Sequence, residues 1–253
     1  MVKVKDISGF IDSLAPYSTQ CEWDNCGILV GSGDKEIKKI GFCLDLTAET
    51  LKEAKENGVD LIVTHHPVIF KAQRNFLEGN IAYDTAVSGI SVISAHTCFD
   101  CADGGVNDVL CEILGIDNAS GVPSTECAVP MARIGTVNET DVASFGGMVA
   151  KKLSTVCRVV NCGKKIKTVA VCGGAGMDFY FDAVKMGADC FVTGDISHHQ
   201  LLLAKETGVS VIAAGHFETE YLSMAALEKT VKDKFKETET LVLKQTNPVE
   251  FIG

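Results

Sequence analysis

Two segments of the chain, residues 38–68 and residues 167–200, decide the fold. The first reads KKIGFCLDLTAETLKEAKENGVDLIVTHHPV and the second reads KTVAVCGGAGMDFYFDAVKMGADCFVTGDISHHQ. Ile40 aligns with Val169 at an offset of 129 residues. Each segment predicts a strand, a turn, a helix, a glycine and a second strand, followed by a histidine pair. We therefore predict an internal duplication; the alternative is a chance similarity between two α/β segments.

A further strand is expected after each segment, in GISVISAHTCFD (residues 89–100) and GVSVIAAGHFETE (residues 208–220). Runs such as LIV and SVIS are continuously apolar, which is typical of parallel strands buried on both faces. Helices are expected in TAETLKEAKENG (residues 47–58) and from Tyr221 in YLSMAALEKTVKDKFKE. We predict an α/β fold of two related lobes, residues 1–125 and 126–253, with mostly parallel sheets flanked by helices.

Composition excludes several classes of protein. The chain has 253 residues, 46% of them hydrophobic and 22% charged, with a net charge of −10. This charge opposes binding to a nucleic-acid backbone, which needs clustered Lys and Arg. No apolar run reaches the roughly 18 residues of a membrane span, and the polar start MVKVKDISGFIDSL lacks a signal-peptide core. We expect a cytoplasmic protein whose eleven cysteines are free thiols.

All six histidines directly follow predicted strands. They are His65, His66, His96, His198, His199 and His216. In a sheet with helices on its faces, ligands bind at the carboxyl ends of the strands, and histidine is the commonest side-chain metal ligand. The distribution therefore predicts one metal-containing pocket between the lobes, built from several strand ends.

The spacing inside these motifs suggests individual roles. In GHFETE, His216 and Glu220 share a helix face if a helix begins there, and an exposed helix start is the alternative. In THHPVIF, the adjacent rings of His65 and His66 diverge in extended chain and could reach different ions. A histidine pair on the surface is the alternative there.

The motif HTCFDCADGGVND places His96, Asp100 and Asp103 beside two glycines, where the carboxylates either join imidazole around a metal or form a turn. It also contains the C-x-x-C spacing of Cys98 and Cys101, for which thiolate ligation is the weaker interpretation.

Three further motifs leave alternatives open. TGDISHHQ supplies Asp195, His198 and His199, which could ligate a metal, transfer protons or form a solvated loop. WDNCGILVG either forms the floor of the pocket or is an N-terminal strand with a buried Trp23. GGAGMD, from Gly173, matches neither the dinucleotide nor the P-loop pattern and is only a weak phosphate-loop candidate.

Five of these motifs, in this order, resemble the Nif-three-like dinuclear-metal family, whose members are called GTP cyclohydrolase 1 type 2 homologues. They are WDNCGILVG, THHPVIF, HTCFDCADGGVND, TGDISHHQ and GHFETE. The resemblance spans nearly the whole chain. It implies a two-lobed α/β fold, a ring-shaped homohexamer and two divalent metal ions per subunit.

By motif position, the resemblance implies a set of metal ligands, with Glu220 bridging the two ions: His65, His66, Asp100, His216 and Glu220. It places His96 beside the ligands rather than among them, and Asp195, His198 and His199 near the metals as catalytic groups. Cys98 and Cys101 look atypical for the family. Imidazole and carboxylate ligands accept Zn, Fe, Mn, Co or Ni.

These observations predict a dinuclear metal-dependent hydrolase. A metal-activated water would attack a nucleotide or another small phosphorylated substrate, because two divalent ions attract an anionic ligand. His96, His198 or His199 would transfer protons. The alternative is a non-catalytic metal-binding or regulatory hexamer. A two-metal nuclease fits the ions but not the acidic charge.

Overall fold

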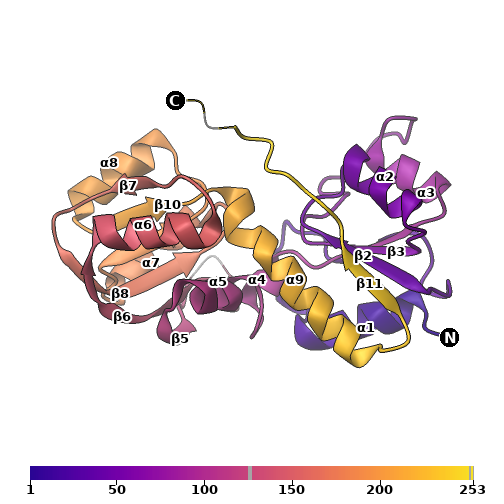
Figure 1. Cartoon of the computed structure of the whole chain (residues 1–253), viewed down its shortest axis with the longest axis horizontal. Coiled ribbons are helices and arrows are strands. Elements are labelled where there is room, and N and C mark those ends of the chain that lie inside the picture. Colours follow the sequence, from indigo (N-terminus) through magenta and orange to yellow (C-terminus); the bar gives the residue numbers. More distant parts are fainter. Residues whose placement is uncertain (125–126, 251, 253) are drawn as a thin grey trace. The chain divides into compact units, whose positions relative to one another are not determined.

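The structure is a computed structural model that describes residues 1–124, 127–250 and 252. The described chain forms two compact units (Figure 1). The first unit contains Met1–Ala102 and Met224–Thr246, and the second contains Asp103–Ser223 and Asn247–Gly253. The lobe boundary predicted from the sequence, at residues 125–126, lies outside the described residues and stays a prediction.

The first unit is built on a five-stranded sheet with the order β1-β4-β3-β2-β11. The strands are β1 (Gly27–Val30), β2 (Lys39–Cys43), β3 (Leu61–Thr64), β4 (Ser91–Ser94) and β11 (Glu239–Val242). Strands β11, β2, β3 and β4 run parallel, and β1 joins the edge antiparallel to β4. Residues in β3 and β4 are buried throughout, as the continuous apolar runs predicted.

Capping side chains mark the start of two helices of the first unit, α2 (Ala48–Glu56) and α3 (Ile81–Val87). The others are α1 (Val4–Leu14), the 3-10 turn η1 (Tyr17–Thr19), α4 (Thr97–Cys101) and the later part of α9 (His216–Lys234). Thr47 caps α2 by accepting a hydrogen bond from Thr50 N, and Gly58 follows the helix with φ of +66°. Leu51 of α2 and Ala82 of α3 pack against the sheet in one apolar core.

The second unit is built on a six-stranded sheet with the order β5-β6-β8-β9-β10-β7. The strands are β5 (Asp117–Gly121), β6 (Arg133–Asp141), β7 (Arg158–Val160), β8 (Lys165–Cys172), β9 (Cys190–Thr193) and β10 (Ser210–Ala213). Neighbouring strands pair in parallel within β8, β9 and β10, whereas the pairs β5–β6, β6–β8 and β10–β7 are antiparallel. The mostly parallel arrangement expected from the sequence therefore holds for the central strands and not for the outer ones.

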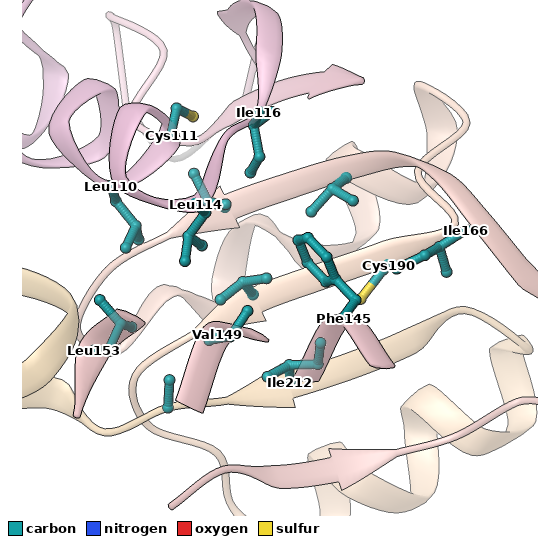
Figure 2. Close-up of a cluster of buried hydrophobic side chains, with 14 of the residues drawn as sticks. Leu110, Cys111, Leu114, Ile116, Phe145, Val149, Leu153, Ile166, Cys190 and Ile212 are labelled. Atoms are coloured by element: carbon teal, nitrogen blue, oxygen red, sulfur yellow. The ribbon is translucent and has the colours of Figure 1, made fainter. Parts of the chain in front are cut away.

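Helices cover both faces of the second sheet. They are α5 (Val106–Leu114), α6 (Val142–Leu153), the 3-10 turn η2 (Gly176–Phe179), α7 (Tyr180–Lys185), α8 (His198–Thr207) and the start of α9. Leucines of α5 and Phe145 of α6 pack over Cys190 and Val192 of β9 (Figure 2). Phe191 points to the opposite face, where its ring lies 5.8 Å from that of Tyr180 in α7.

The strand registers of the two sheets correspond, as a duplication requires. Cys43 pairs with Thr64 in the first sheet, and Cys172 pairs with Thr193 in the second, at the offset of 129 residues seen in the sequence. At this offset the pair at residues 65–66 corresponds to residues 194–195, and not to the histidines at 198–199.

In the part of the chain that the structure describes, no helix combines the length and the apolar character needed to cross a bilayer.

Candidate metal centre

Three of the six histidines lie at the carboxyl ends of parallel strands in the first unit. His65 and His66 follow β3 directly, and His96 lies two residues beyond the end of β4. Backbone hydrogen bonds hold these ends in register: His65 N donates to Cys43 O at 3.2 Å, and Ala95 N donates to Thr64 O at 2.9 Å. Parallel pairing therefore gathers side chains that are 30 residues apart in the chain.

The three imidazole rings of the first unit form one cluster. The ring centroids of His65 and His66 are 5.0 Å apart, those of His65 and His96 are 5.1 Å apart, and those of His66 and His96 are 5.4 Å apart. One ring nitrogen from each lies within 4.8 Å of the others. Three nitrogens this close can share a divalent cation.

Each of these rings is held by its Nδ1 atom. The partners are Ala95 O for His65 at 2.9 Å, Asp45 Oδ1 for His66 at 2.7 Å and Asp24 Oδ1 for His96 at 2.8 Å. An acceptor at Nδ1 fixes the tautomer in which Nδ1 carries the proton and Nε2 carries the lone pair. Metal-ligating histidines in proteins are oriented in this way by a carboxylate or a carbonyl oxygen.

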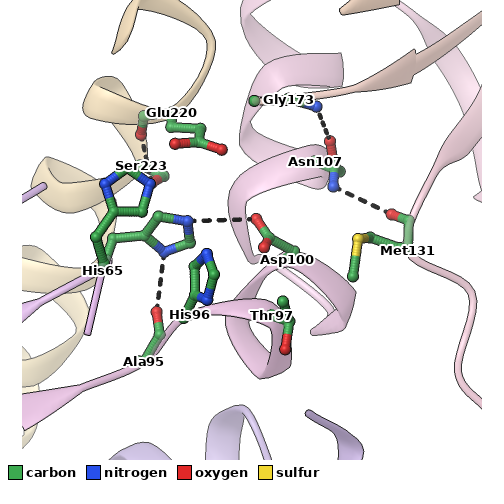
Figure 3. A network of polar contacts seen from close by, with 12 residues as sticks. His65, Ala95, His96, Thr97, Asp100, Asn107, Met131, Gly173, Glu220 and Ser223 are labelled. Carbon is green, nitrogen blue, oxygen red and sulfur yellow. Dashed lines mark hydrogen bonds and ion pairs between the residues drawn. The ribbon is translucent and has the colours of Figure 1, made fainter. Parts of the chain in front are cut away.

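A carboxylate from α4 lies beside this cluster. Asp100 Oδ1 is 3.6 Å from His65 Nε2, and the Asp100 side chain is only 11% exposed (Figure 3). His65 is completely buried. A buried imidazole facing a buried carboxylate is a donor set that suits Zn²⁺ and similar divalent ions.

A second set of donors lies in the second unit, at the start of α9. His216 is the first residue of this helix and Glu220 lies one turn later, as the sequence predicted, with His216 Nε2 3.2 Å from Glu220 Oε2. Asp195 Oδ2 lies 2.7 Å from His216 Nδ1. His216 is therefore oriented by a carboxylate like His66 and His96, and Glu220 is a buried carboxylate.

The absence of a side chain at two glycines makes room for this second set. A Cβ at Gly174 would lie 2.1 Å from Glu220 Oε1 and 3.1 Å from His216 Nε2, and a Cβ at Gly194 would lie 2.7 Å from the Cα of His216. Gly174 and Gly194 correspond by the 129-residue offset to Asp45 and His65 in the first unit. The two copies have thus diverged, because the start of α9 occupies the space that side chains fill in the first copy.

Asp24 is the most tightly held of the orienting carboxylates. Its oxygens accept hydrogen bonds from His96 Nδ1, from Thr97 N at 3.0 Å and from the Thr97 hydroxyl. Burial by itself raises the pKa of a carboxyl group, but the hydrogen bonds from His96 and Thr97 and the charge of His96 outweigh it. They hold the pKa of Asp24 well below its usual range.

Other residues predicted from the sequence lie in different surroundings. His198 and His199 are exposed at the start of α8, where the Ser197 hydroxyl contacts the ring of His199. Among the described residues, the candidate metal groups include neither of them. Asp195, expected as a catalytic group, holds His216, and His96, expected beside the ligands, lies in the same cluster as His65 and His66.

Two minor interpretations of the sequence are wrong. Trp23 is not buried: it is 59% exposed, and its ring lies 5.6 Å from that of Phe70 and 5.9 Å from that of His96. The loop from Gly173 does not offer its amides to a phosphate. Gly173 N donates to Asn107 Oδ1 at 2.8 Å (Figure 3), and Gly174 N donates to Thr219 Oγ1 at 3.0 Å.

Asp24 and Asp45 are the functional residues that sequence reasoning missed. Asp45 follows β2 as the histidines follow β3, so its position at a strand end was the available signal. Asp24 lies before β1, within a motif that the sequence singled out, but nothing local indicates that its carboxylate reaches His96.

Comparison with known proteins places the chain among proteins of the same architecture. Residues 2–248 match the family model described as Duf34/NIF3 (NGG1p interacting factor 3). A Clostridium perfringens protein named GTP cyclohydrolase 1 type 2 homolog is 34% identical, over 99% of this chain and all of the relative. A crystal structure of a Staphylococcus aureus hypothetical protein is 28% identical with a TM-score of 0.91, and 99% of each chain is covered. A Bacillus cereus protein related to NIF3 has a TM-score of 0.89 at 22% identity, again over 99% of each chain. The chain belongs to the DUF34/NIF3 family.

Proposed function

We propose that this protein is a cytoplasmic, dinuclear metal-dependent hydrolase that acts on a nucleotide or another small phosphorylated substrate. The observation that carries the proposal is the common orientation of four histidines. A carbonyl or carboxylate oxygen holds Nδ1 of each one, which leaves Nε2 as the donor atom. Such uniform orientation is the arrangement that metal-binding histidines require.

We further propose that the protein binds two divalent ions through its histidine and carboxylate donors. These donors are His65, His66, Asp100, His216 and Glu220, with His96 added because its ring lies in the cluster of the first unit. When bound, two such ions would lower the pKa of a water molecule and stabilise negative charge on a phosphate or a ring. The name of the Clostridium perfringens relative supports a nucleotide as the substrate.

The residues around the donors have separate tasks in this proposal. Asp24, Asp45 and Asp195 fix ring orientation and so keep the donor atoms in place before any ion binds. The exposed rings of Trp23 and Phe70, both beside His96, offer an apolar surface for part of the substrate. His198 and His199 remain our candidates for proton transfer, since both rings are exposed at the start of α8.

The experiment combines metal analysis with a turnover screen. We expect elemental analysis of the purified protein to give two divalent ions per chain, and a nucleotide panel that includes GTP to yield formate or a phosphate product. Glu220→Gln should remove both metal and turnover, because it takes a buried carboxylate from the donor set. Glu206→Gln, an exposed carboxylate of α8, is the matched control and should change neither.

The same screen distinguishes this proposal from the alternative, which is a non-catalytic metal-binding or regulatory hexamer. That alternative predicts rapid, reversible metal exchange and no product from any nucleotide. Full turnover by chelated, metal-free protein would contradict the hydrolase proposal. Light scattering of the purified protein measures the mass of the assembly and so tests the predicted homohexamer separately.

A further inference from the structure

Two cysteines from distant parts of the first unit lie in direct contact. Cys26 precedes β1 and Cys98 lies in the first turn of α4, yet their Sγ atoms are 3.4 Å apart. Cys98 is completely buried, whereas Cys26 is half-buried. Two thiols at this distance need only a small local movement to reach the bond length of about 2.05 Å in a disulfide.

The thiol pair is connected to the groups that hold His96. The backbone N–H of His96 donates to Cys26 Sγ at 3.4 Å, and the Cys26 thiol donates to Asp24 Oδ2 at 3.4 Å. Asp24 in turn accepts from His96 Nδ1. A change in the bonding of Cys26 therefore acts on both the backbone and the ring of His96.

A role as metal ligands does not account for this pair. The candidate metal groups among the described residues consist of histidine and carboxylate side chains and contain no cysteine. The C-x-x-C spacing of Cys98 and Cys101 suggests a different pair of thiols, whereas the sulfur contact that the structure shows joins Cys98 to Cys26.

We propose that Cys26 and Cys98 form a reversible disulfide when the protein meets a hydroperoxide. The sulfur of Cys26, the more accessible of the two, attacks one oxygen of hydrogen peroxide and becomes a sulfenic acid. The O–O bond breaks, and the other peroxide oxygen leaves as a water molecule. The sulfur of Cys98 then attacks the Cys26 sulfur, and the sulfenic oxygen leaves as a second water molecule. Two thiols lose two electrons and two protons in total, and one peroxide is reduced to two waters. A dithiol reverses the reaction by exchange.

Closing the disulfide changes the surroundings of Asp24 and His96. The Cys26 thiol can no longer donate to Asp24, and the sulfur that accepts from the His96 amide moves toward Cys98. If the proposed metal site is correct, the oxidised protein should bind divalent ions more weakly. Loss of a group that orients a ligand weakens metal binding by roughly 10-fold to 100-fold.

The test uses the full chain, stripped of metal and kept in chelator. Untreated protein is compared with protein that has been treated with hydrogen peroxide and then freed of the excess peroxide. Thiol titration of the unfolded protein should fall from eleven to nine, and peptide mapping should find Cys26 joined to Cys98. The Cys26→Ser variant, changed at a half-buried position, should keep all its thiols. Cys101→Ala is the matched control and should still lose two thiols through the same link. Dithiothreitol should restore the count.

A second measurement tests the consequence for the metal site. Mn²⁺, which prefers oxygen and imidazole over thiolate, is titrated into the reduced and the oxidised protein, with a roughly tenfold or greater rise in Kd expected. Equal affinities would overturn the link to the metal site, and eleven remaining thiols or a Cys98–Cys101 bond would overturn the disulfide itself. If the reduced protein binds no Mn²⁺, the proposed metal function fails, while thiol count and mapping still decide the disulfide.

Discussion

Asp24 Oδ1 lies 2.8 Å from His96 Nδ1, although 72 residues separate the two in the chain. The carboxylate is completely buried and also accepts from Thr97 N. Asp24 thus connects the loop before β1 to the start of α4, and the same contact sets the direction of the His96 ring. One carboxylate therefore holds two segments of the first unit together and orients a candidate metal ligand.

The first prediction concerns this carboxylate. Asp24→Asn removes the charge and turns an N–H₂ group toward donors, so we expect metal affinity to fall roughly 10-fold to 100-fold. The metal-free protein should also lose about 2 kcal/mol of stability, because hydrogen bonds to a buried charged group are lost. Calorimetric titration and urea unfolding measure the two effects. Asp34→Asn, which changes an exposed carboxylate paired with Lys5, is the control and should alter neither. Unchanged metal affinity in Asp24→Asn would exclude Asp24 as an orienting group.

The second prediction separates the two tasks assigned to residues of the second unit. Asp195→Asn should weaken metal binding, because Asp195 holds His216 Nδ1. His198→Asn and His199→Asn should leave metal content unchanged, because neither ring belongs to a candidate metal group among the described residues. They should alter the pH dependence of turnover, because the proposal assigns proton transfer to these rings. Metal analysis and pH–rate profiles of the three variants provide the comparison. Loss of metal from His199→Asn would assign this ring to the donor set instead.

Much of this arrangement follows from the sequence, and the reasons are local. The buried parallel strands show as continuous apolar runs, Thr47 caps α2 as expected, and the spacing of His216 and Glu220 is that of one helix turn. The antiparallel strand β5 could not be predicted in this way, because its sequence DNASG is polar and largely exposed and carries no apolar pattern. The Asp24–His96 contact is equally invisible, since it depends on tertiary packing across 72 residues.

The third prediction compares two glycines that both have a positive φ but differ in their surroundings. Gly174 and Gly187 both have positive φ, +58° and +87°, but a Cβ at Gly187 meets no atom within 4 Å. Each change to Ala should cost about 1 to 2 kcal/mol from the left-handed backbone. Only Gly174→Ala should also lose metal affinity, because its Cβ would displace the carboxylate of Glu220. Equal metal binding in the two variants would show that Glu220 is not a ligand or can relocate without cost.

The fourth prediction concerns acid stability. Asp141 caps α6 and accepts from Ser144 N at 2.8 Å, and the hydrogen bonds from Ser144 lower its pKa. Because the pKa in the folded state is below the unfolded value of about 3.9, this carboxylate stabilises the fold above that pH and loses its effect as the pH falls through the folded value. Urea midpoints of Asp141→Ala should therefore lie below wild type at pH 7 and approach it at pH 3. Asp117→Ala, an exposed change within β5, is the control and should follow wild type at both values.

The fifth prediction follows from binding linkage. An ion that binds the folded chain and not the unfolded chain stabilises it by about 2.7 kcal/mol when its free concentration is 100 times the Kd. Thermal unfolding of the wild type should therefore move to higher temperature when Mn²⁺ is added and return when chelator is added. This rise in unfolding temperature should vanish in His65→Asn, because the variant lacks a proposed metal donor whose ring is completely buried within the histidine cluster. The His65→Asn protein could also be less stable without metal, so its own chelated form is the reference. A full Mn²⁺ increment in this variant would place the bound ion elsewhere in the molecule.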